Sequence, residues 1–131
     1  MDLNPVAIVV SAVGVQVISM VYYIAFTKQL AQLSPAYADP SDTSPSPGKL
    51  VVELVRNLVL ATVVAGLAGL IDTTDVTDGL KLGLALWVGF PIVLWTGAVL
   101  WEKIPPKLAT IHAGDWLLKL LVISAVVSVW R

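Results

Sequence analysis

The stretch Leu108–Trp130 reads LATIHAGDWLLKLLVISAVVSVW, and one lysine, Lys119, stands near its middle. A helix needs about 20 mostly apolar residues to cross a bilayer, so this stretch is long enough to do so. Lys119 would then lie near the membrane midplane, where a lone charge costs at least about 2.5 to 3.5 kcal/mol. Asp115 precedes it by one helical turn. The stretch therefore predicts a membrane-spanning helix whose lysine is either paired or functional.

The whole chain has the composition of an integral membrane protein. Hydrophobic residues make up 57% of its 131 residues and charged residues only 13%, and its mean hydropathy is +0.87. Soluble domains carry about 25% charged residues, so the lipid bilayer is the expected partner. The net charge of -1 argues against nucleic acid, which needs a basic patch. The absence of cysteine excludes disulfides and thiolate metal sites.

Four apolar segments predict an all-α, four-transmembrane-helix bundle that forms a single membrane domain over residues 1–131. We expect the spans at about residues 5–26, 48–71, 79–101 and 108–130. Residues 29–47 are rich in proline and serine, which predicts a loop outside the hydrocarbon. No Lys or Arg precedes the first span, which is also too long for the apolar core of a signal peptide, so we interpret it as a retained helix.

Small residues recur at four-residue spacing in the second and third spans. Such stripes let neighbouring helices approach closely, and they predict the helix-packing positions Ala61, Ala65, Gly69, Gly79 and Gly83. We expect a homo-oligomer that assembles through these faces. Within the third span, proline removes a backbone hydrogen bond, so the sequence predicts a kink between Trp87 and Pro91.

Lys and Arg are unevenly divided between the two predicted sides of the membrane. The loops after the first and third spans, with the adjoining helix ends, hold Lys28, Lys49, Arg56, Lys103 and Lys107, whereas the opposite side holds Lys81 and Arg131. The positive-inside rule then places both termini outside and both richer loops in the cytoplasm. We expect a multi-pass protein of a bacterial plasma membrane.

This topology brings polar side chains of the second and fourth spans to a common depth. Both spans begin on the same side, and the rise of a helix puts their polar residues roughly 8 to 14 Å inside. These residues share one face in each helix: Glu53, Arg56 and Asn57 in the second, and His112, Asp115 and Lys119 in the fourth. We expect the acids and bases to neutralise one another. Gln16, within the first span, needs a hydrogen-bond partner on a neighbouring helix.

This intramembrane polar cluster has two interpretations. In one, it lines a hydrated path for a small ion, a proton or a small polar ligand, as ionisable residues in spans often do, and the chain is a channel or transporter-like protein. In the other, it clamps helices or subunits together in a non-transporting structural or accessory protein. His112, the only histidine, either relays protons or else caps its helix or hydrogen-bonds near the start of it.

The sequence predicts no catalytic residues, metal or cofactor. It lacks an HExxH motif, a Gly-rich phosphate loop and a nucleophile elbow, and the carboxylates Glu53 and Asp115 lie on different helices beside bases, so we expect no enzyme. The acids of residues 72–78 offer oxygen ligands to a divalent cation but match no calcium loop, and helix capping is the alternative. Three tryptophans within spans are interpreted as packing residues: Trp87, Trp95 and Trp116.

Short segments along almost the whole chain are similar to a known family. These segments are Asn4–Ala7, Tyr22–Tyr23 with the following Lys28, Trp87–Phe90, Trp101–Glu102 and Ile111–Trp116. They resemble the bacterial membrane family catalogued as domain of unknown function seventeen sixty-one. The resemblance implies a small four-helix membrane protein without assigned activity, and it supplies no catalytic residues. The family pattern has a Trp near Pro5, a Trp-Tyr pair at Tyr22–Tyr23 and an apolar or small residue at Lys119, so a role for this lysine would be particular to this chain.

Overall fold

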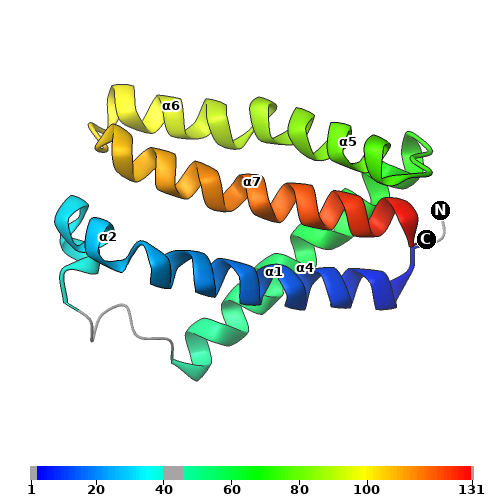
Figure 1. Cartoon of the computed structure of the whole chain (residues 1–131), viewed down its shortest axis with the longest axis horizontal. Coiled ribbons are helices and arrows are strands. Elements are labelled where there is room, and N and C mark those ends of the chain that lie inside the picture. Colours follow the sequence, from blue (N-terminus) through cyan, green and yellow to red (C-terminus); the bar gives the residue numbers. More distant parts are fainter. Residues whose placement is uncertain (1–2, 40–45, 131) are drawn as a thin grey trace.

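Helix α7 (Pro106–Val129) lies at the centre of the bundle in the computed structural model, which describes residues 3–39 and 46–130 (Figure 1). It packs against α1 (Pro5–Ala25), α4 (Pro47–Leu70), α5 (Val76–Gly89) and α6 (Pro91–Trp101). Each regular element within the described ranges is helical. Four helical segments are long and apolar enough to cross a membrane: residues 5–25, 47–70, 76–101 and 106–129. The predicted all-α architecture with four spanning helices is therefore confirmed.

The start of α1, the end of α7 and the connection between α4 and α5 lie at one end of the bundle, whereas α2 and the connection between α6 and α7 lie at the opposite end (Figure 1). Helices α5 and α6 continue one another along one side of α7, and α1 runs along its other side. Helix α4 crosses the others at an angle, so its first half diverges from α1 and α7. This divergence separates polar side chains that a parallel bundle would press together.

The segment predicted as a loop over residues 29–47 begins with more structure than expected. Helix α2 (Thr27–Leu33) is followed by a 3-10 turn, η1 (Pro35–Tyr37), so the prediction is wrong for residues 29–33. The first proline of the segment 29–47 is Pro35, so every residue of α2 keeps its backbone N–H donor. Leu30 is buried against the first turns of α7. Pro40 and Pro45 fall outside the described residues.

The third span begins at Val76, earlier than expected, because the Asp75 side chain caps it by accepting a hydrogen bond from the Asp78 backbone N–H at 2.8 Å. This finding supports the capping interpretation of the acids in this connection. The span is broken rather than gently bent. Helix α5 ends at Gly89 and α6 starts at Pro91, which lacks the N–H needed to continue the hydrogen-bond ladder.

Residues of the small-residue stripes make contacts between helices of the same chain. A Cβ atom added at Gly83 would lie 2.8 Å from the Leu120 carbonyl oxygen, and one at Gly79 would lie 2.6 Å from the Ser124 carbonyl oxygen. These two glycines therefore let α5 approach the backbone of α7. Ala61 and Ala65 are buried within the bundle and Gly69 is half-buried. Close helix contacts within the chain thus account for the small size of Gly79 and Gly83, and burial in the core accounts for that of Ala61 and Ala65.

Candidate functional site

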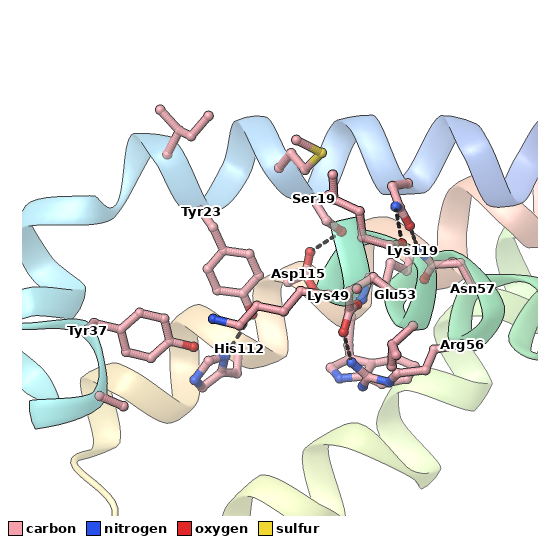
Figure 2. A pocket seen from close by; sticks show the side chains of 18 of the residues that line it. Ser19, Tyr23, Tyr37, Lys49, Glu53, Arg56, Asn57, His112, Asp115 and Lys119 are labelled. Atoms are coloured by element: carbon pink, nitrogen blue, oxygen red, sulfur yellow. Dashed lines mark hydrogen bonds and ion pairs between the residues drawn. The ribbon is translucent and has the colours of Figure 1, made fainter. Parts of the chain in front are cut away.

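A cavity of about 920 Å³ opens where α4 diverges from α1 and α7 (Figure 2). All six residues of the predicted intramembrane polar cluster line it: Glu53, Arg56, Asn57, His112, Asp115 and Lys119. The first half of α4, the second half of α1 and the first half of α7 form most of the wall, and Trp95 of α6 and Tyr37 of η1 complete it. The expectation of a shared depth thus corresponds to one common cavity.

Asp115 and Lys119 form a buried ion pair in this cavity. The Lys119 Nζ atom lies 3.2 Å from Asp115 Oδ2, and the two side chains are 8% and 3% exposed, respectively. Ser19 on α1 donates its hydroxyl hydrogen to Asp115 Oδ1 at 2.6 Å. The Lys119 ammonium also lies 5.1 Å from the ring centroid of Trp116, within the range of a cation–π interaction. The carboxylate and the π-electrons together compensate a charge that hydrocarbon would not tolerate alone.

A second ion pair, between Glu53 and Arg56, lies at the accessible side of the cavity. Both residues belong to α4, and their side chains are 43% and 57% exposed. The acids and bases of the cluster neutralise one another as expected, and each acid pairs with a base on its own helix. Spacings of three and four residues already place the partners side by side. The divergence of α4 keeps the two pairs on separate walls.

The polar links between helices run mainly from α1. Gln16 accepts a hydrogen bond from the Asn57 amide at 2.9 Å and donates one to the Leu50 carbonyl at 3.1 Å, which ties α1 to α4. Tyr22 donates to the Ile111 carbonyl of α7 at 2.6 Å. Gln16 thus finds the cross-helix partner that its position in a span requires.

His112 lies within a group of aromatic side chains at one end of the cavity (Figure 2). A hydrogen bond of 2.7 Å joins its Nδ1 atom to the Tyr23 hydroxyl. The Trp95 ring stacks on the imidazole at 4.7 Å between centroids, and the Tyr37 ring lies 6.2 Å away. His112 therefore does not cap α7, which begins with Pro105 at the capping position; it packs and hydrogen-bonds inside the cavity wall.

Tyr37 lies outside the spanning helices, and the carboxylates of the cavity affect the pKa of its hydroxyl. Burial raises the pKa of its hydroxyl above the usual value, and the negative charges of Asp115 and Glu53 raise it further. Both effects oppose ionisation, so the hydroxyl stays protonated and able to donate a hydrogen bond.

Four residues that help to build the site were not predicted from the sequence: Ser19, Tyr23, Tyr37 and Trp95. From the sequence alone, Trp95 is interpreted as a packing residue, and Tyr23 is named only among the segments that carry the family resemblance. The i, i+4 spacing of Ser19 and Tyr23 shows that they share a face of α1. Nothing in that spacing shows that the face meets Asp115 and His112.

The comparison with known families covers nearly the whole chain. Residues 6–128 match the model of a family described as protein of unknown function, DUF1761. The chain belongs to the DUF1761 family. No curated protein and no solved structure matches it. Two of the segments that carry the resemblance, Tyr22–Tyr23 and Ile111–Trp116, meet in the structure through the hydrogen bonds of Tyr22 and Tyr23 to α7. The DUF1761 description assigns no activity, so the chemistry has to follow from the cavity itself.

Proposed function

We propose that this DUF1761 protein is a small transporter-like membrane protein whose cavity binds a polar or ionic solute near the middle of the bilayer. The observation that carries the proposal is a cavity of about 920 Å³ that reaches the buried Asp115–Lys119 pair. Lys119 lies about 20 Å along α7 from Pro106, by the rise of 1.5 Å per residue. A route from the start of α7 to this depth covers more than half of a hydrocarbon core of about 30 Å.

The arrangement of α4 supports this proposal. Its first half is held to α1 by the hydrogen bonds of Gln16, and the cavity fills the space that remains between α4 and α7. A rocking of α4 against the α1–α7 pair would open or close the route to Lys119. Both carboxylates of the cavity are paired with bases, which favours binding and passage over acid–base catalysis.

The second candidate function is a non-transporting accessory protein, in which the polar residues clamp helices together. The cross-helix hydrogen bonds favour it, since Ser19, Tyr22 and Tyr23 all tie α1 to α7. A clamp needs close packing, however, and it gives no reason for a cavity of this size beside the ion pair. This difference makes the two candidates separable by experiment.

The test compares purified protein in proteoliposomes with protein-free vesicles, using proton, monovalent-ion and small-solute gradients. We expect flux above the empty vesicles for the wild type. The double variant Asp115→Leu with Lys119→Leu removes both charges together, so no unpaired charge is left in the bundle. We expect it to assemble normally and to lose the flux. A wild type that passes none of these species would leave the clamp as the function, and a double variant with undiminished flux would show that passage does not depend on the ion pair.

The orientation of the chain in the membrane and the type of membrane are also part of this proposal. The excess of Lys and Arg beside the connections after α1 and α6 supports cytoplasmic loops and outward termini, in a bacterial plasma membrane. The cavity then opens toward the cytoplasmic side, because its walls are the halves of α1, α4 and α7 nearest those connections. A homo-oligomer remains part of the proposal, but its contacts would have to use faces other than the buried small-residue stripes.

A further inference from the structure

The cavity contains buried hydrogen-bond donors without matching acceptors. The indole Nε1 atom of Trp95 is buried and has no hydrogen-bond partner among the described residues, and an indole N–H can only donate. The Lys119 ammonium offers three N–H donors, and Asp115 is the one carboxylate within bonding distance in the described ranges. Buried donors are left unpaired less often than acceptors. The donors that Asp115 leaves free on Lys119 therefore favour a ligand that supplies acceptor atoms.

The charges of the cavity specify the acceptor further. Lys119 on α7 and Arg56 on α4 line the same space, and each has only one carboxylate partner among the described residues. A guanidinium has five N–H donors and a carboxylate can engage few of them. Hydrogen bonds from cations to anionic oxygens are about twice as strong as neutral ones. An anionic oxygen is thus the acceptor that these walls bind best.

Where the cavity opens between α1 and α4, its edge is lined by exposed apolar side chains. Its apolar lining includes Met20 and Ile24 of α1, which are 40% and 71% exposed, and Val52 of α4, which is 58% exposed. These residues lie within helices long and apolar enough to span a membrane, so their exposed side chains face lipid. A molecule that enters between α1 and α4 passes from hydrocarbon toward the buried Lys119 ammonium.

We propose that the cavity binds a single-chain lipid amphiphile whose anionic head, a carboxylate or a phosphate, accepts hydrogen bonds from Lys119 while its chain lies between α1 and α4. The cavity volume of about 920 Å³ falls within the usual range for pockets that hold small organic ligands, roughly 300 to 1,000 Å³. This inference rests on the proposed function in using the same cavity, but it concerns binding and does not require passage.

The experiment uses four ligands with one identical chain: oleate, oleyl phosphate, oleyl alcohol and oleylamine. Native mass spectrometry of the full chain, released from a neutral detergent with each ligand at equal mole fraction, gives the bound fraction. We expect oleate and oleyl phosphate to bind at least about ten-fold more tightly than the alcohol, the least that charge-assisted bonds of about 1.5 to 3 kcal/mol provide. We expect the amine to bind no better than the alcohol.

Variants then locate the site. Asp115→Asn with Lys119→Gln replaces the ion pair by a neutral pair of similar size, and we expect it to lose the preference for both anions. Lys81→Gln removes a lysine from the exposed face of α5, away from the cavity, and should leave the preference unchanged. A comparison of oleate with oleyl phosphate decides between the carboxylate and the phosphate as the head that fits.

Two results would overturn the inference: equal binding of oleyl alcohol and the anions by the wild type, or an anion preference that survives in the neutralised variant. The first result needs no variant, so a variant that fails to fold does not protect the idea. Anion binding without solute flux would retain this inference and reject the proposed transport. Solute flux without anion preference would do the reverse.

Discussion

Lys119 and Asp115 depend on one another at the residue scale, because each is buried and the other supplies the opposite charge. Lys119→Leu leaves a buried carboxylate with the Ser19 hydroxyl as its remaining partner among the described residues. We expect this variant to lose about 3 to 5 kcal/mol of unfolding free energy, as for other broken buried pairs. Reversible unfolding in mixed micelles measures the loss. The double variant with Asp115→Leu should recover most of it, and equal losses in the two variants would contradict the pairing.

The hydrogen bond between Tyr23 and His112 gives a second prediction with a matched control. Tyr23→Phe removes a hydroxyl that bonds to the imidazole at 2.7 Å, so we expect a loss of about 1 to 2 kcal/mol. Tyr37→Phe makes the same change beside the same imidazole, at a ring whose contact to His112 is aromatic. The control should change stability by less than about 0.5 kcal/mol. Similar losses in both variants would show that the Tyr23 hydrogen bond adds nothing specific.

The sequence predicted how deep the polar side chains lie in the membrane, but it did not predict which helices face one another. The fixed rise of a helix places Glu53 and Asp115 at similar levels, and both line the same cavity in the structure. The same rise says nothing about which helix faces which. The sequence therefore could not show that Ser19 and Tyr23 bond to α7, whereas the spacing of Asp115 and Lys119 did indicate an ion pair within one helix.

At the scale of elements, the contact between α5 and α7 depends on glycine. A Cβ at Gly83 would lie 2.8 Å from the Leu120 carbonyl oxygen, so Gly83→Ala must push the two helices apart. We expect a loss of about 1 to 3 kcal/mol, as in other overpacked cores. Gly97→Ala is the matched control on α6, because a Cβ there meets nothing within 4 Å. The control should be neutral or gain up to about 1 kcal/mol from helix propensity.

Unfolding titrations of both glycine variants check this prediction, and a tolerated Gly83→Ala would contradict the close contact.

The boundaries of the helices were predicted from the sequence only in part. Proline at position 91 correctly indicated a disruption of the third span. The proline-rich composition after α1 was interpreted too broadly, because residues 29–33 precede the first proline of that segment and form part of α2.

For the whole molecule, the membrane orientation is open to a direct test. The chain contains no cysteine, so single cysteines give a label without background. Lys103→Cys lies between α6 and α7, and Thr74→Cys lies between α4 and α5, at opposite ends of the bundle. In intact cells we expect a membrane-impermeant thiol reagent to label position 74 only, and position 103 after permeabilisation. The reverse pattern would invert the proposed orientation and turn the cavity toward the outside.

The central claim is that the cavity gives small polar molecules access to position 119 and that an ammonium there is needed for passage. In Lys119→Cys, 2-aminoethyl methanethiosulfonate would attach a short chain ending in an ammonium and so rebuild a lysine-like side chain. Ile123→Cys, one turn further along α7, is the control, because Ile123 is fully buried in the core away from the cavity lining. We predict that position 119 reacts and regains the solute flux of the wild type in proteoliposomes, while position 123 stays unlabelled. An unreactive position 119, or a labelled protein whose flux does not return, would contradict the account.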